Sequence, residues 1–455
     1  MVSMVPELSG PERGQSARRL RLAVYGVLAE NAGSGAGAFP VLLSALLERG
    51  HRVEFFGNPV YVRPRSLERF AGYRFHPLHV EAIDRLWYRT ERFELARTIV
   101  SQLGHAAYAR EAIRQIEREH EREPYDLIFA TDVQPLWPSR LPVLSWPQSP
   151  PQTEAAALRT PALARELLKI NGPGNYAVIQ AFYVYRLLTA QLALRCSDVY
   201  LCGSHWARDE WERFGAAPEQ LEPFPYPIDI RPFASVPLLV PRSAPTFLWL
   251  GRSTPRKRLD LFIEGFLELR QRYPEVRARI VGNVAAHPFG RAVLERHGHV
   301  PGLSVEPAIA RESVPELFAD IDVLVQPSQN ENFGFSVAEA LAAGRAVVAG
   351  PTNGTLEYAG RAGFGFSEYS ASSVADAMER ALHAIRLDGP GVSRSARQAA
   401  QQFEVDGVTE RFAAQCEKLI DRRARTGAPR CHERLTNVLL QRRKSHERAV
   451  IFADS

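Results

Sequence analysis

Seven prolines crowd the middle of this chain, between Pro223 and Pro245. Proline fixes φ and lacks an N–H donor, so neither a helix nor a central strand runs through such a stretch. The chain has 455 residues, which is too long for a single hydrophobic core. The prolines therefore predict a boundary between two domains.

Short apolar runs alternate with helical patterns on both sides of this boundary. Before it, residues 22–27 read as a buried strand, which a Gly-rich loop at 33–37, a helix and a second strand at 52–56 follow. Strand–helix–strand order implies parallel sheets. Further strands are expected at 126–130, 143–146, 199–202, 246–250, 277–281, 323–326 and 346–349, with helices near 258–271, 313–320 and 336–343. The pattern predicts two Rossmann-like α/β domains that face a cleft.

These patterns divide the chain into five segments. We predict a loose leader (1–20), an N-terminal domain (21–235), a C-terminal domain (236–395), C-terminal helices (396–425) and a basic tail (426–455). The C-terminal helices are expected to cross back to the first domain.

Composition places the protein among ordinary globular chains, with 45% apolar and 24% charged residues. The net charge of +5 suits an acidic ligand, a nucleic acid or an anionic membrane, and does not choose among them. Four scattered cysteines fit a reducing compartment. We see no secretory signal, and we interpret the richest apolar stretch, 176–201, as a buried helix plus a strand. We therefore expect a cytoplasmic protein, and we expect no nucleic-acid partner.

The most informative segment runs from Pro327 to Gly344, after a predicted strand and into a predicted helix. Gly334 allows a tight turn that presents backbone N–H groups. The N-terminus of the new helix adds unsatisfied donors and a positive dipole end, which suit a diphosphate. Glu331 and Glu339 bracket this turn, and such carboxylates are good acceptors for sugar hydroxyls.

A second segment places cations after a strand that ends at Gly251. Arg252 and Lys257 are suited to neutralise a diphosphate leaving group, Arg through its fork and Lys as a point charge. The two segments together indicate a nucleotide diphospho-sugar.

At these residues the sequence resembles the retaining GT-B glycosyltransferases of family four. That family carries Glu-x7-Glu with an aromatic–Gly pair after the first Glu, and a Gly-Arg pair with a Lys five residues after the Arg. The matching residues are Glu331, Phe333, Gly334 and Glu339, then Gly251, Arg252 and Lys257, and before the linker Pro227, Ile228, Asp229 and Phe233. The resemblance implies a GT-B fold, with an acceptor-side N-terminal domain and a donor-side C-terminal domain.

The resemblance also implies roles for these residues. Glu331 would hold hydroxyls of the transferred sugar, Glu339 the ribose, and Arg252 with Lys257 the diphosphate. Sugar transfer would retain configuration, with a UDP-, GDP- or ADP-linked sugar as donor and a saccharide, lipid-linked or small-molecule acceptor. We expect no tightly bound cofactor and no metal. Further candidates for donor binding are Gly35, Gly251, Asn332, Phe333, Gly334 and Phe335.

One position departs from the family. Many members carry a His at the end of a strand in the N-terminal domain, where this chain has Gln148. Gln can hydrogen-bond a sugar hydroxyl but carries no charge. The departure bears on sugar identity and on activity, and it motivates the alternative of a non-catalytic GT-B protein that binds sugar nucleotides.

Other motifs have competing interpretations. The Gly33-x-Gly35-x-x-Ala38 spacing with Glu54 fits an NAD-binding fingerprint, although Glu54 lies inside a strand and not at its end. We favour a capping or solvated turn over a metal site at Asp320–Asp322, and a capping turn at His205. Glu357 is predicted either to line the cleft or to lie on the surface. Arginines near 422–425 and 442–444 are interpreted as a solvated tail, with weak peripheral membrane contact as the alternative.

Overall fold

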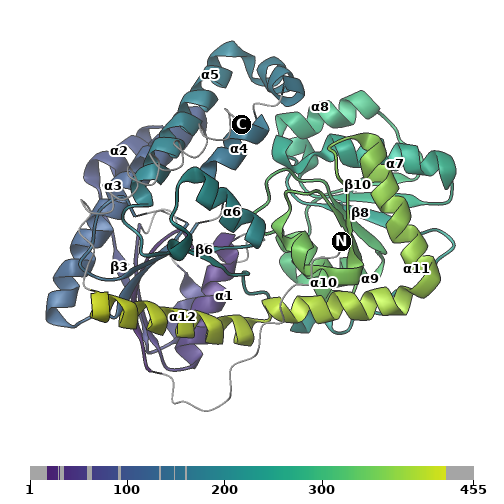
Figure 1. The fold of residues 1–455 in the computed structure, drawn as a ribbon. Coiled ribbons are helices and arrows are strands. Elements are labelled where there is room, and N and C mark those ends of the chain that lie inside the picture. Colours follow the sequence, from purple (N-terminus) through teal and green to yellow (C-terminus); the bar gives the residue numbers. More distant parts are fainter. Residues whose placement is uncertain are drawn as a thin grey trace, which may run out of the picture.

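The structure is a computed structural model that describes residues 18–28, 30, 35–58, 64–90, 94–132, 135–147, 149–158 and 161–426. Two α/β domains lie side by side, each built around its own sheet (Figure 1). Neighbouring strands run parallel in both sheets. The predicted α/β class and the two Rossmann-like domains are thereby confirmed.

The N-terminal sheet has seven strands in the described part of the chain. Their order is β3 (Tyr73–Pro77), β2 (Arg52–Gly57), β1 (Arg21–Gly26), β4 (Leu127–Thr131), β5 (Val143–Trp146), β6 (Val199–Cys202) and β7 (Leu221–Pro223). The helices of this domain are α1 (Gly35–Glu48), α2 (Glu81–Arg89), α3 (Glu94–Arg122), α4 (Pro151–Leu158), α5 (Pro161–Ala193) and α6 (His205–Phe214).

The C-terminal sheet has six described strands. Their order is β10 (Leu303–Glu306), β9 (Arg277–Val281), β8 (Thr246–Leu250), β11 (Val323–Gln326), β12 (Ala346–Ala349) and β13 (Gly363–Gly365). The helices are α7 (Leu259–Arg272), α8 (Pro288–His297), α9 (Val314–Ala319), α10 (Phe335–Ala342) and α11 (Ala371–Ala400), and α12 (Val405–Thr426) follows.

The strands that the sequence patterns missed are those at the sheet edges. β3, β7, β10 and β13 form the four edges, and most of their residues are half-buried or exposed. A strand that keeps much of its surface in solvent needs no continuous apolar run, so its sequence signal is weak. The apolar helix expected within 176–201 is also less buried than predicted, because Leu188 in α5 is 63% exposed. None of the helices in the described ranges combines the length and apolarity needed to cross a membrane.

The chain crosses between the domains at two adjacent places. The N–H of Ile228 donates to the carbonyl of Phe403 at 2.7 Å, and Ile228 forms a parallel bridge with Glu404. After this point α12 runs back along the N-terminal domain (Figure 1), where Phe412 packs against Phe129 with ring centroids 4.9 Å apart. The expected return of the C-terminal helices is confirmed, while the boundaries at 235 and 395 stay predictions.

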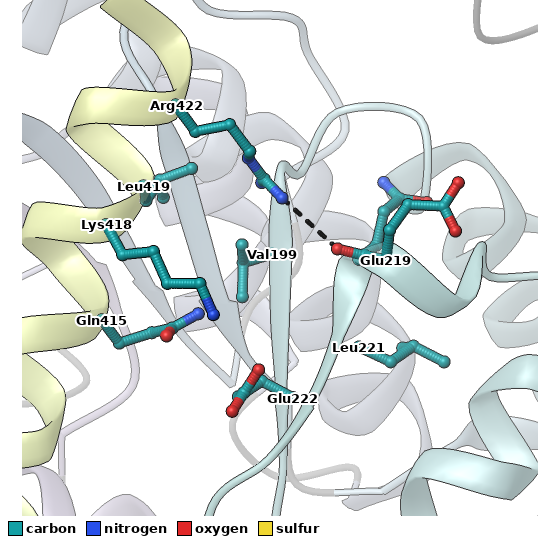
Figure 2. Close-up of a pocket in the computed structure, with 9 residues that line it drawn as sticks. Val199, Glu219, Leu221, Glu222, Gln415, Lys418, Leu419 and Arg422 are labelled. Carbon is teal, nitrogen blue, oxygen red and sulfur yellow. Dashed lines mark hydrogen bonds between the residues drawn. The ribbon is translucent and has the colours of Figure 1, made fainter.

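The end of α12 is anchored by arginines that the sequence analysis assigned to a solvated tail. Arg423 forms an ion pair with the buried Asp198 at 3.3 Å, and Arg422 donates to the carbonyls of Asp198 and Glu219 at 3.0 and 3.3 Å. That interpretation was wrong for these two residues, because they lie on α12 and their side chains bond residues of the N-terminal domain. Residues 442–444 lie outside the described residues. Figure 2 shows the crevice beside this anchor, which α12 forms with the edge of the N-terminal sheet.

Candidate functional site

The two motifs meet because of the strand order in the C-terminal sheet. β8 and β11 are parallel neighbours, so their C-terminal ends lie at one edge of the sheet. The segment after β8 begins at Gly251, whose φ of +151° is a conformation that side-chain-bearing residues rarely adopt. A 3₁₀ turn at Pro255–Lys257 follows, and the indole of Trp249 donates to the carbonyl of Lys257 at 3.3 Å.

Glu331 is the centre of a compact charge cluster. Its carboxylate pairs with the ammonium of Lys257 at 2.5 Å and with the guanidinium of Arg256 at 2.9 Å. The Glu331 side chain is 11% exposed and that of Lys257 is 18% exposed. The structure thus joins the predicted residues Glu331 and Lys257 in one site and adds Arg256.

The pKa values in this cluster follow from burial and from the neighbouring charges. Burial acts to raise the pKa of Glu331, but Arg256 and Lys257 outweigh it, and the pKa lies below its ordinary value. Burial lowers the pKa of Lys257, and the Glu331 carboxylate opposes that change. Arg252 is exposed, and its charge adds to the lowering of the Lys257 pKa. The cluster therefore offers cations beside a carboxylate at the end of the sheet.

The loop between β11 and α10 takes its shape from a residue other than the one predicted. Asn330 has a φ of +57°, whereas Gly334 has a φ of −84° and precedes α10 as its N-cap. The N–H of Gly334 donates to Thr355 Oγ1 at 2.8 Å. Gly334 itself therefore needs no glycine-specific φ, and its predicted part in donor binding stays a prediction. Its N–H is already bound within the protein.

Helix α10 still presents backbone donors at its start. Its first i→i−4 hydrogen bond runs from Ala338 to Gly334, so the amides of Phe335, Ser336 and Val337 precede it and have no partner within the helix. Such amides and the positive end of the helix dipole favour an anion. The structure therefore places backbone donors without a helical partner at the start of α10, from Phe335 onward, and anion binding there stays a prediction.

Glu339 lies within α10 and pairs with a residue that the sequence analysis did not consider. Its carboxylate contacts Arg311 at 3.0 Å and is 7% exposed. Burial raises the pKa of Glu339, and Arg311 opposes this change. No sequence signal distinguished Arg311 from the other surface arginines, because it lies on a separate 3₁₀ turn.

The aromatic residues of the motif point into the protein. Phe333 is 4% exposed and packs against Tyr226 and Phe335, with ring centroids 5.5 and 5.1 Å away. Tyr226 in turn stacks on Trp146 of the N-terminal domain at 4.7 Å. The ring of Phe333 therefore joins the two domains and is not presented to a ligand.

The remaining predicted site residues are Asn332, Gly35 and Gln148. Asn332 is buried, and its side chain accepts from the N–H of Gly203 at 3.0 Å and donates to the carbonyl of Pro147 at 3.5 Å. Gly35 opens α1 in the N-terminal domain. Gln148 lies outside the described residues.

The residue proposed for an NAD ribose has a structural role. Glu54 is 2% exposed and accepts hydrogen bonds from Arg21, His76 and Tyr125 at 2.6, 2.7 and 2.7 Å. Those bonds engage both carboxylate oxygens. Glu54 thus connects β2 to residues in or beside β1, β3 and β4. It is not available to bind an NAD ribose.

Of the acidic pair at Asp320–Asp322, only Asp322 is built into the sheet. Asp322 is 1% exposed, accepts from the N–H of Thr246 at 2.7 Å and lies 3.5 Å from Arg242. It connects the starts of β8 and β11, which the expected capping or solvated turn does not describe, whereas the exposed Asp320 ends α9 as its C-cap. The described residues contain no cluster of three His, Cys, Asp or Glu side chains that could hold a metal.

Comparison with solved structures defines the class of fold. Sucrose-phosphate synthase from Thermosynechococcus elongatus has a TM-score of 0.62 at 16% identity and covers 89% of this chain and 100% of its own. The Anabaena protein HepE, in complex with UDP and glucose, has a TM-score of 0.57 at 15% identity and covers 88% and 99%. The chain has the GT-B fold of glycosyltransferases, as predicted.

Sequence comparison matches the C-terminal domain to a family. Residues 244–384 match the model of glycosyl transferases group 1. The D-inositol 3-phosphate glycosyltransferase of Kineococcus radiotolerans is 29% identical over 187 residues, which cover 37% of this chain and 43% of that protein. The enzyme of the same name from Streptomyces avermitilis is 31% identical over 193 residues, which cover 40% of each. The matches thus span about two fifths of these relatives.

Proposed function

We propose that this protein is a glycosyltransferase that moves a sugar from a nucleotide diphospho-sugar to an acceptor with retention of configuration. The observation that carries the proposal is the cluster of Glu331 with Lys257 and Arg256 next to the amides that open α10. A carboxylate for sugar hydroxyls and cations for a diphosphate stand together there. The match of residues 244–384 to glycosyl transferases group 1 supports the same reaction.

The proposed reaction uses electrostatics and positioning. The bond from the sugar's anomeric carbon to the diphosphate breaks while a bond to the acceptor oxygen forms on the same face. The acceptor proton passes to the departing phosphate, so no side-chain nucleophile or resident metal is required. Lys257 and Arg252 stabilise the leaving group, as preorganised cations do in a site that excludes water. Glu331 orients the sugar and Glu339 holds the ribose.

Uridine nucleotides are the first donors to test. Similar structures of the Anabaena protein HepE hold UDP with glucose or UDP-glucose. The named relatives also suggest D-inositol 3-phosphate as the first acceptor to include. We propose that the protein works in the cytoplasm and that chelation of metals leaves transfer unchanged.

A nucleotide panel tests the donor site. UDP, GDP and ADP are added to the full chain, and the melting temperature is measured. A ligand at about 100 times its Kd adds roughly 2.7 kcal/mol to the free energy of unfolding, which raises the melting temperature by several degrees. At least one nucleotide should give this rise, whereas NADH should not. No rise with any of the three would contradict the donor site.

Replacing Glu331 with glutamine should separate binding from transfer. The carboxylate competes with a diphosphate for Lys257 and Arg256, so its neutralisation removes this competition. We expect the Kd of the bound nucleotide to stay the same or fall, while the rate of donor turnover falls at least roughly 100-fold. Calorimetry measures the first quantity and release of the free nucleotide the second. Parental turnover in the variant would exclude the proposed role of Glu331, and an inactive parent protein would favour a non-catalytic binding protein.

A further inference from the structure

Glu357 belongs to the C-terminal domain but binds the N-terminal one. It lies in the 3₁₀ turn Gly354–Tyr358, and its carboxylate accepts from the N–H groups of His205 and Trp206 at 2.7 and 3.3 Å. These are the first two residues of α6, which lies beside the other domain in Figure 1. Ser204 caps the third amide from within its own domain, through a bond from Ala207 at 3.1 Å. The start of α6 is therefore capped by both domains together.

The same turn is bonded to the backbone of Glu331. The N–H of Glu331 donates to the carbonyl of Thr352, and the N–H of Gly354 donates to the carbonyl of Glu331, both at 2.8 Å. Glu331 also forms a parallel bridge with Asn353. A displacement of the Glu357 turn would thus move the backbone that carries Glu331.

The two domains pack closely against each other around Glu357. A Cβ on Gly354 would lie 2.1 Å from Ser204 Oγ, so only glycine lets the two domains approach this closely. Asn332 reaches across the same boundary to the N–H of Gly203. Asn330 does so as well, through its bond to the carbonyl of Thr153 in α4.

We propose that Glu357 is a positioning residue that clamps the orientation of the two domains and thereby sets the place of Glu331 relative to the N-terminal domain. The proposal rests on the proposed function for its consequence in catalysis. The clamp itself does not depend on it. A donor bound to the C-terminal domain and an acceptor bound to the N-terminal domain react only when the two are aligned, so a loosened clamp lowers the rate of transfer more than the affinity for the nucleotide.

The raised pKa of Glu357 agrees with a carboxylate enclosed by protein. Burial raises this pKa, and the amides of His205 and Trp206 with the His205 charge oppose the change. A neutral amide keeps an acceptor oxygen for one of these donors but gives up the charge. Glu357→Gln should therefore keep part of the clamp, and Glu357→Ala none of it.

The clamp can be measured without any nucleotide. Spin labels are placed at Glu81 and Leu387, which are 83% and 90% exposed and lie in different domains, with Cys431 replaced by serine. We expect one narrow interlabel distance in the parent, a broader distribution in Glu357→Ala and an intermediate one in Glu357→Gln. The control Glu368→Ala removes an exposed carboxylate of the same domain and should match the parent. A parental distribution in Glu357→Ala would overturn the proposal.

A second measurement tests the catalytic consequence. In Glu357→Ala the Kd for the nucleotide should stay within about twofold of the parent, while the rate of donor turnover falls roughly tenfold or more and recovers partly in Glu357→Gln. Unchanged turnover would refute the positioning role. Because the spin-label distances need no ligand, a chain that binds no nucleotide would refute the proposed function and leave the clamp standing. If the alanine variant does not fold, the glutamine variant decides both measurements by the same criteria.

Discussion

Replacing Lys257 with alanine should weaken nucleotide binding about 10- to 100-fold and remove most of the rise in melting temperature that the nucleotide causes. The Lys257 ammonium is 2.5 Å from the Glu331 carboxylate and 18% exposed, so it acts at the end of β8 with little screening by water. A hydrogen bond to a charged group contributes about 1.5–3 kcal/mol, which corresponds to this loss of affinity. Calorimetry with the best nucleotide of the panel measures the effect directly.

The fold should survive this substitution, which makes the result interpretable. Glu331 keeps its ion pair with Arg256 at 2.9 Å, so no buried carboxylate is left without a partner. Lys418→Ala serves as the matched control, because Lys418 is an exposed lysine on α12. The control should bind nucleotide as the parent does. If Lys257→Ala keeps parental affinity, the diphosphate does not bind at this cluster.

Replacing Glu54 with alanine should destabilise the N-terminal domain by about 3–5 kcal/mol, the range found when one partner of a buried ion pair is removed. The Arg21 guanidinium would stay in its buried place with its main carboxylate partner gone. His76 and Tyr125 would each lose a hydrogen bond of 2.7 Å. Urea unfolding measures the loss. Glu81→Ala, at a side chain that is 83% exposed, is the control and should change stability by less than about 0.5 kcal/mol.

The same group predicts how stability depends on pH. Burial acts to raise the pKa of Glu54, but hydrogen bonds from His76, Tyr125 and Arg21 outweigh it and lower the pKa from 4.5 to about 2. A carboxyl whose pKa is lowered by folding stabilises the protein above its unfolded pKa, and this contribution is lost as the pH falls toward the folded value. We expect roughly 3 kcal/mol to disappear between pH 4.5 and 2. In Glu54→Gln this part of the pH dependence should be absent, and an unchanged profile would contradict the assignment.

Much of the fold was readable from local patterns. Apolar runs such as residues 323–326 are fully buried in a parallel sheet, and a run of that kind has few other stable arrangements. The prolines from 223 to 245 end the first sheet at β7 because they offer no N–H groups for a continuing strand. The half-exposed edge strands such as β10 escaped prediction, since a strand with water on much of its surface carries little apolar signal.

The sequence predicted several individual residues of the candidate site but only some of the contacts between them. Glu331 and Lys257 stood out through their spacing from a turn and from a strand end, which are local properties. The partners Arg256 and Arg311 did not stand out, because only the packing of segments distant in sequence decides which of several arginines reaches a given carboxylate. For the same reason the local pattern did not show that Tyr125 and His76 surround Glu54.

The sequence by itself determined the class of fold and the residue types at the end of β8 and before α10. These follow from backbone geometry and from burial along the chain, which neighbouring residues largely set. The tertiary structure alone decided which charges pair, that the ring of Phe333 packs between the domains, and that Glu357 caps a helix of the other domain. The physical reason is that ion pairs and interdomain contacts depend on distances of a few ångströms between groups that are far apart in the sequence.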